Sequence, residues 1–203
     1  ALKPDLVVAW KSGNQASDIE RLEQLGFRLF VIEPATLAAI PRLLRALGRL
    51  SGSAAVAGSA ADTFETGITA LRERHANHSN VRVFYEIWHQ PLMTVNGRHL
   101  INDVIELCGG ANVFAGERTL TPVVSLESVI AARPDVVLGG SSSVTPAQFA
   151  AQWRRYEDFV ALRGIEALFV NPDWIQRQTP RILEGAQSVC AHLEKTRRDR
   201  GIN

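Results

Sequence analysis

The chain has 203 residues, of which 22 are lysine or arginine and 21 are aspartate or glutamate, so its formal net charge is +1. This balance argues against a nucleic-acid-binding surface, and no run approaches the roughly 18 apolar residues of a membrane-spanning helix. The length suits one large domain or two small ones, each with a core of its own.

Strand-like and helix-like segments alternate along most of the chain. The continuous apolar run LVVAW at 6–10 is typical of a buried parallel strand. Further strands are expected at 27–32, 81–87, 136–138 and 168–170, and helices at 16–25, 37–47, 99–108 and 126–132, with two more opening at Thr145-Pro146 and Thr179-Pro180. This alternation predicts an α/β fold with parallel sheets.

One long segment, residues 53–78, interrupts the alternation. It contains no proline, and its apolar residues recur at spacings of three and four, at Val56, Ala60, Phe64, Ile68 and Leu71. Its last turn carries cations that the helix dipole favours, namely Arg72, Arg74, His75 and His78. We therefore expect a rigid helix of roughly 35–40 Å.

The two ends of the chain repeat each other in order. Residues 1–9, ALKPDLVVA, align with 131–139, AARPDVVLG, and PRLL at 41–44 aligns with PRIL at 180–183. The near-constant offset indicates a duplicated architecture. Such a duplication predicts two α/β units of similar build.

The predicted fold is therefore two Rossmann-like lobes joined by a single long helix. The C-terminal part of the first lobe occupies 1–52, the linker helix 53–78, and the second lobe 79–203. Residues 131–133 are expected to end a helix, so their counterparts at 1–3 should do the same. The first lobe is accordingly expected to be incomplete at its N-terminus and to expose apolar surface.

Ligands of open parallel sheets bind beyond the carboxyl ends of the strands. Three of the four tryptophans, Trp10, Trp88 and Trp174, fall at such positions. Each alone would more often be packing material, but three together fit a large planar ligand. Asp173 and Arg177 would grip polar edges of that ligand, or would form a local ion pair that holds their loop.

Enzymatic and metal chemistry have weaker support. The loop Gly139–Ser143 would have to bind an anion or supply a nucleophile in a hydrolytic enzyme, but it lacks the P-loop lysine and any Gly-x-Ser-x-Gly motif. The five histidines are scattered, so no metal site is predicted. We expect a binding protein with no catalytic residues and no resident cofactor.

Cys108 and Cys190 are the two cysteines of the chain. They are either two buried thiols or a disulfide, and an exported protein favours the disulfide.

Three segments carry a family resemblance: ALKPDLVVAW at 1–10, IELCGGANVF at 105–114 and DWIQRQTPR at 173–181. They resemble the periplasmic vitamin B12-binding proteins, helix-linked substrate-binding proteins of ABC importers, and the resemblance extends over essentially the whole chain. It implies a periplasmic protein that binds cobalamin or a related corrinoid in the cleft between its lobes. The ligand would be delivered to the permease subunits, through which alone the protein would meet the membrane, and no nucleic acid is involved.

The resemblance also implies roles for individual residues. Trp10, Asp173 and Arg177 match cleft residues of the family, and Trp174 lies in the same motif. The two cysteines match the family's disulfide pair. Glu127 matches a glutamate that pairs with permease arginines.

Some positions depart from the family pattern. Met93 stands in place of a phenylalanine, and Trp88 and His89 lie outside the pattern, where they would compensate by stacking and hydrogen bonding. A haem or ferric-siderophore binder of the same fold is the alternative. Haem would require an axial ligand, for which His89 or a tyrosine in the missing part of the first lobe is a candidate.

Overall fold

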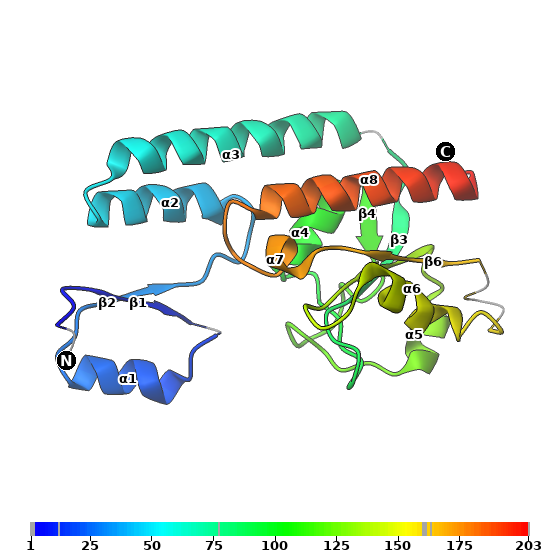
Figure 1. The fold of residues 1–203 in the computed structure, drawn as a ribbon, viewed down its shortest axis with the longest axis horizontal. Coiled ribbons are helices and arrows are strands. Elements are labelled where there is room, and N and C mark those ends of the chain that lie inside the picture. The colour runs from blue at the N-terminus through cyan, green and yellow to red at the C-terminus, as the bar shows by residue number, and fades with distance from the viewer. Residues whose placement is uncertain (1–2, 12, 77, 160–161, 163, 203) are drawn as a thin grey trace. The chain divides into compact units, whose positions relative to one another are not determined.

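The computed structural model describes residues 3–11, 13–76, 78–159, 162 and 164–202. The chain divides after Ala35 into two compact units, and Figure 1 shows their helices and strands. The expected α/β class with parallel sheets is confirmed. The lobe boundaries expected at residues 52 and 78 stay predictions.

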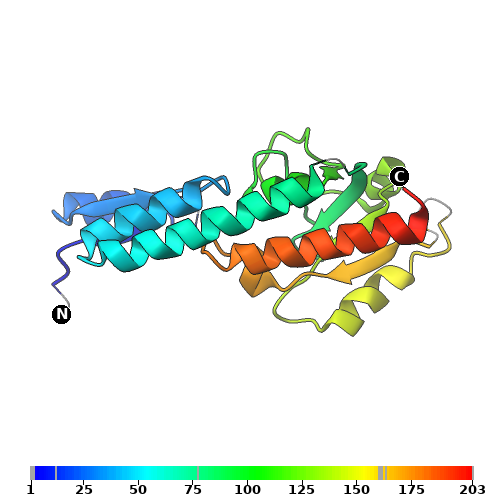
Figure 2. The ribbon, with the colours of Figure 1, turned by 90° about the horizontal axis from the view of Figure 1, so that it is seen from above.

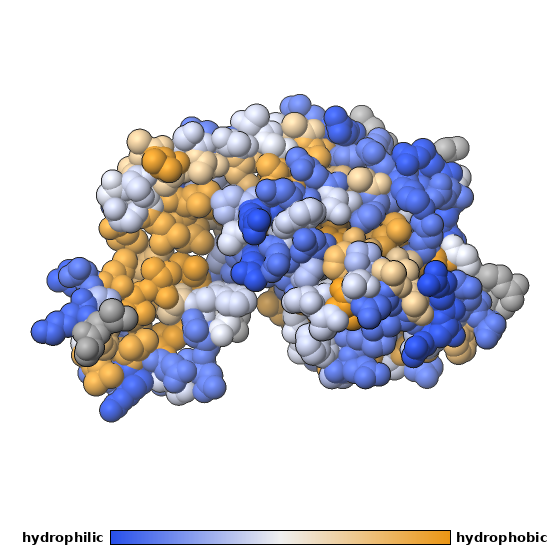
Figure 3. All heavy atoms as spheres, in the orientation of Figure 1, coloured by the Kyte–Doolittle hydropathy of each residue, from blue (hydrophilic) through white to orange (hydrophobic). Residues whose placement is uncertain are grey.

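The first unit contains a parallel strand pair and one helix. Its elements are β1 (Val7–Trp10), α1 (Ala16–Gln24) and β2 (Leu29–Ile32). The strands pair from Val7–Leu29 to Trp10–Ile32. Apolar side chains of both strands, Val8 and Val31 among them, are exposed, and Figure 3 shows hydrophobic atoms gathered there.

The second unit is built on a four-stranded parallel sheet. Its strands are β3 (Val81–Glu86), β4 (Gly110–Asn112), β5 (Val136–Gly139) and β6 (Glu166–Phe169), in the order β4-β3-β5-β6. The inner strand β3 is buried at every residue except Arg82, as expected for a parallel strand covered on both faces.

Helices cover both faces of this sheet. Val81, Val83 and Tyr85 of β3 pack into a core with α4 (Leu100–Leu107) and α8 (Ile182–Arg200). Phe84 points the other way, as strand alternation requires. It packs into a second core with α6 (Pro146–Arg154) and α5 (Leu126–Ala132).

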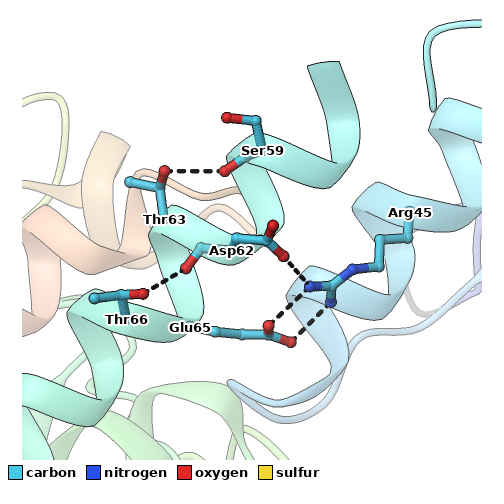
Figure 4. A network of polar contacts seen from close by, with 6 residues as sticks. All are labelled: Arg45, Ser59, Asp62, Thr63, Glu65 and Thr66. Atoms are coloured by element: carbon cyan, nitrogen blue, oxygen red, sulfur yellow. Dashed lines mark hydrogen bonds and ion pairs between the residues drawn. The ribbon is translucent and has the colours of Figure 1, made fainter. Parts of the chain in front are cut away.

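A helical hairpin, α2 (Ala39–Leu50) and α3 (Ala54–His75), belongs to the second unit. Gly48 permits its close packing, because a Cβ there would lie 2.3 Å from the Cβ of Ala57. Arg45 of α2 binds Asp62 and Glu65 of α3 at 2.6 and 2.8 Å (Figure 4). The hydrogen bond from Arg45 lowers the pKa of the Glu65 carboxyl.

The long helix predicted at 53–78 is confirmed as α3, which runs beside α2 and then beside α8 (Figure 2). Its predicted apolar face is wrong in its first half, since Val56 is 74% exposed and Ala60 is also exposed. Val56 lies about 140° around the helix from the buried Ala61. The buried side chains of α3 are Ala61, Phe64, Ile68, Leu71 and His75.

His75, which the sequence places among the cations of the last turn, is buried. The residue is 3% exposed, and burial lowers its pKa. His78, expected in the same helical turn, lies beyond the end of α3, with its Nδ1 3.2 Å from that of His75.

Several element boundaries differ from expectation. Helix α2 runs three residues beyond its predicted end, and α8 begins three residues after Thr179. Strand β4 and the short helix α7 (Pro172–Ile175) were not predicted. The predicted helix starts at Ser125 and Thr145 are confirmed, because each side chain accepts a hydrogen bond from the backbone three residues on.

A disulfide joins Cys108, at the end of α4, to Cys190 within α8. Both residues are buried in the core that holds α4, α8 and β3. The disulfide is therefore confirmed and the two-thiol alternative is wrong. No helix in the described ranges is long and apolar enough to cross a membrane.

Candidate ligand-binding site

A pocket of about 310 Å³ opens at the carboxyl edge of the second sheet. One wall is the segment that ends β3 and follows it, and the other is the loop after β5, with Gln152 of α6 beside them. The lining residues are Glu86, Ile87, Trp88, His89, Gln90, Gly140, Ser141, Ser143, Val144 and Gln152. The predicted site residues Trp88 and His89 are thus brought together.

The segment after β3 is a tight reversal that presents Trp88. Ile87 donates its backbone N–H to the Met93 carbonyl at 3.0 Å, and Met93 donates to the Trp88 carbonyl at 2.9 Å. The Trp88 indole donates to the Gln90 carbonyl at 2.8 Å, while 53% of the residue stays exposed. Met93 pairs with Val123 on its other side and does not line the pocket.

A buried carboxylate that sequence reasoning missed lies in this pocket. Glu86, the last residue of β3, is 4% exposed and accepts a 2.6 Å hydrogen bond from the Trp153 indole. Its other oxygen lies 3.2 Å from His89 Nδ1. Burial raises the pKa of Glu86, although His89 and Trp153 act in the opposite direction. An acid directly after the apolar run at 83–85 was the signal available in the sequence.

Two glycines bring the loop after β5 against Glu86. A Cβ on Gly139 would lie 2.4 Å from the Glu86 carbonyl oxygen, and one on Gly140 would lie 2.7 Å from the Val170 carbonyl oxygen. Only glycine fits these two positions. Gln176 adds a hydrogen bond to the Gly140 carbonyl at 3.1 Å, which ties the loop to the segment after β6.

The serines of this loop are not paired with a general base, as a serine hydrolase would require. The Ser141 and Ser143 hydroxyls lie 2.8 Å apart and bond to each other. Across the ranges that the structure describes, neither hydroxyl is hydrogen-bonded to a histidine. A base bonded to the serine is what activates a hydroxyl nucleophile.

Asp173, Trp174 and Arg177 lie on or just after α7. Asn171 opens this helix by accepting a hydrogen bond from the Asp173 N–H, and Ile175 anchors it in the core. Asp173 and Arg177 form an exposed ion pair at 2.7 Å, and Trp174 is half-buried. None of these three predicted site residues lines the pocket.

Trp10 belongs to the first unit and ends β1. Its ring lies over Gly13, where a Cβ would come within 1.9 Å of the indole, and its Nε1 is 3.4 Å from a Glu33 carboxylate oxygen. The residue is 41% exposed, so an aromatic surface is available at the end of this strand.

Glu127 lies in the first turn of α5 and is exposed. Hydrogen bonds from its own backbone N–H and from the Ser125 hydroxyl lower the pKa of its carboxyl.

No group of three or more His, Cys, Asp or Glu side chains converges as a metal site within the described part of the chain. His89 and Glu86 supply two groups in one pocket, too few to hold a bare ion by themselves.

Comparisons with known proteins agree on one family. Residues 1–164 match the family of periplasmic binding proteins. A vitamin B12-binding protein of Vibrio parahaemolyticus is 36% identical over 98% of this chain and 72% of its own length. The crystal structure of the periplasmic vitamin B12 binding protein BtuF of Vibrio cholerae is 31% identical with a TM-score of 0.86, covering 96% of this chain and 75% of that one.

More distant structures share the fold. The periplasmic haem-binding protein BhuT is 17% identical with a TM-score of 0.80, over 95% of this chain and 76% of its own. At this identity the likeness concerns the fold alone.

Proposed function

The chain belongs to the periplasmic binding proteins, the substrate carriers of ABC importers, and from this premise we propose that it binds cobalamin or a related corrinoid and delivers it to a membrane permease. The similarity to vitamin B12-binding proteins over nearly the whole chain carries this proposal. A member of this family is a carrier, so the alternative of a hydrolytic enzyme is set aside. The corrinoid is the transported ligand and not a cofactor.

The pocket beside Trp88 supplies one contact surface for such a ligand. A corrinoid is larger than the drug-sized molecules that pockets of roughly 300–1,000 Å³ enclose, so its macrocycle would lie across the mouth and not inside. The exposed face of Trp88 offers wide apolar contact with small loss of entropy. Polar groups at the rim, such as Gln90, would meet the amide side chains of the corrin.

The remaining predicted residues take supporting roles in this proposal. Trp174 presents further aromatic surface in the second unit, and Asp173 and Arg177 exchange part of their exposed ion pair for hydrogen bonds to ligand amides. Trp10 offers an aromatic surface of the first unit. Exposed ion pairs contribute little to stability, so this exchange has a small energetic cost. Met93 acts indirectly, because its backbone bonds hold the Trp88 reversal in place.

Delivery requires a surface that the permease can bind. Glu127 is exposed and negatively charged, and it would pair with an arginine of a permease subunit like those that serve vitamin B12-binding proteins. The periplasm is the compartment of the family, and the disulfide between Cys108 and Cys190 suits its oxidising conditions.

Titration of the protein with cyanocobalamin tests the proposal. We expect quenching of tryptophan fluorescence and co-elution of a red protein on gel filtration. The variant Trp88→Ala should bind about tenfold more weakly, because one aromatic contact contributes on the order of 1 kcal/mol. Phe159→Ala is the matched control, since Phe159 is exposed but does not line the pocket.

Haem provides the opposing outcome. Two results together would identify haem, and not a corrinoid, as the ligand of this site. Haem would give a saturable shift of its Soret band, and a high excess of cyanocobalamin or of cobinamide would cause neither quenching nor co-elution.

A further inference from the structure

The pocket contains a histidine whose two ring nitrogens have different surroundings. His89 Nδ1 is buried and lies 3.2 Å from an oxygen of Glu86, within ion-pair distance but not in hydrogen-bond geometry, whereas a quarter of the side chain is exposed. Because Nδ1 is inaccessible, a ligand at the mouth of the pocket would reach the ring through its opposite edge, which carries Nε2. The contact between His89 and Glu86 does not use Nε2.

The neighbouring carboxylate decides which nitrogen carries the proton. A lone pair on Nδ1 would face the Glu86 oxygen at 3.2 Å and be repelled, so the neutral ring places its proton there. The lone pair is then on Nε2. Histidines that bind metals are oriented in the same way, with a carboxylate or carbonyl on the nitrogen that is not bound to the metal.

Glu86 is itself held in place. Its second oxygen accepts the 2.6 Å hydrogen bond from Trp153, and its backbone is packed against Gly139. The carboxylate therefore cannot turn away when a ligand enters, which keeps the imidazole in one orientation.

We propose that His89 coordinates the cobalt of a bound corrinoid through Nε2, with Glu86 as the positioning residue that orients the imidazole. This coordination rests on the proposed corrinoid function. One histidine is too few for a bare ion, but a metal held in a planar macrocycle needs only an axial ligand from the protein. The cobalt–Nε2 bond forms, the bond from cobalt to an axial water breaks, the water leaves, and cobalt keeps its oxidation state.

Two cobinamides, corrinoids without a nucleotide base, test the coordination. Diaquocobinamide has exchangeable waters at both axial positions, whereas cyanide occupies both positions in dicyanocobinamide. The wild-type protein should shift the visible absorption bands of diaquocobinamide and leave those of dicyanocobinamide unchanged. Binding of both is measured in parallel by ultrafiltration.

The variants separate coordination from packing. His89→Ala should bind diaquocobinamide without the band shift and at least as weakly as Glu86→Gln does. Glu86→Gln should weaken its binding by about 10- to 100-fold, the usual effect of losing such an orienting partner. Binding of dicyanocobinamide should weaken much less than that of diaquocobinamide in both variants, because cyanide already occupies the axial positions of its cobalt. His78→Ala, a histidine outside the pocket, is the control and should behave as the wild type.

The wild-type protein alone gives the decisive outcomes. Retention of diaquocobinamide with an unchanged spectrum overturns the coordination while the proposed corrinoid function stands. If the protein retains neither of the two cobinamides nor cyanocobalamin, the proposed function and the coordination are both rejected. In the cobalt(II) state, nitrogen hyperfine splitting that changes on ¹⁵N-histidine labelling would confirm the bond directly.

Discussion

At the scale of single residues, His75 shows how burial changes a side chain that the sequence places at a helix end. Its Nδ1 lies 3.2 Å from His78 Nδ1 and 3.6 Å from a Glu194 oxygen. Burial lowers its pKa, the Glu194 carboxylate opposes this, and the charges of His78, Arg197 and Arg74 add to it. His75 is therefore neutral at pH 7 although it ends α3.

The lowered pKa makes His75 a source of acid sensitivity. In the unfolded chain His75 binds a proton near pH 6.5, but in the folded protein it does so only at lower pH. The unfolded state thus holds more protons in this interval, and stability falls as pH decreases through it. We predict that His75→Gln loses less of its free energy of unfolding than the wild type between about pH 8 and pH 5.5.

Urea unfolding at several pH values measures this difference. Both proteins keep His192, whose pKa burial also lowers, and Glu86 and Asp103, whose pKa values burial raises. Subtraction of the two curves cancels these contributions and isolates His75. Parallel curves for the wild type and the variant would contradict the prediction.

The same residue shows a limit of sequence reasoning. The sequence pattern correctly places His75 in the last turn of α3. Whether another segment covers that turn depends on contacts between residues that are distant in sequence. Glu86 was missed for a similar reason, since its partners Trp153 and Gly139 are more than 50 residues away.

At the scale of elements, two glycines of the α2–α3 hairpin have opposite surroundings. A Cβ on Gly48 would lie 2.3 Å from the Cβ of Ala57 and 3.3 Å from the Ala54 backbone, whereas one on Gly58 would meet nothing within 4 Å. Alanine favours a helix over glycine by about 1 kcal/mol, so propensity alone predicts a gain at both positions.

We predict effects of opposite sign. Gly48→Ala forces the helices apart and should lower the free energy of unfolding by about 1–2 kcal/mol, since overpacking outweighs propensity. Gly58→Ala should raise it by about 0.5–1 kcal/mol. Denaturant unfolding of the two variants serves as a matched comparison. An increase in the free energy of unfolding at both positions would show that the hairpin can accommodate a methyl group at Gly48.

Elements were predictable where pattern and capping agree. The helices that follow Ser125 and Thr145 begin where the capping residues predict. Strand β4 has three residues and the sequence Gly-Ala-Asn, which carries no strand preference, so its pairing with β3 alone makes it a strand. Helix α7 is one turn long and depends on its Asn171 cap and on packing against α8.

At the scale of the molecule, the α/β class and the parallel sheets followed from the alternation of apolar runs and helices. The position of the polar groups in the pocket could not be predicted from the sequence, because it depends on how the loops after β3 and β5 approach each other. Trp88 and His89 line the pocket, whereas Asp173 and Arg177 pair with each other outside it, and the ligand contacts expected of all four stay predictions.

The disulfide is a constraint of the whole second unit. It closes a segment of 82 residues that includes β5, α5, α6 and β6. In the chain-entropy description, such a cross-link stabilises the folded state by up to about 4–5 kcal/mol, because it restricts the unfolded chain. We predict that reduction lowers the free energy of unfolding by an amount approaching this value.

A second anchor joins the same elements and should keep them together once the disulfide is reduced. Arg197 of α8 donates hydrogen bonds of 2.8 Å to the carbonyls of Cys108 and Gly109 and one of 2.9 Å to that of Ser79. With these bonds intact, the reduced protein should remain folded, with unchanged circular dichroism and unchanged corrinoid binding. Urea unfolding with and without reductant measures the loss, and the double variant Cys108→Ala/Cys190→Ala should be insensitive to reductant. Unfolding on reduction alone would mean that the Arg197 bonds cannot hold α4 against α8.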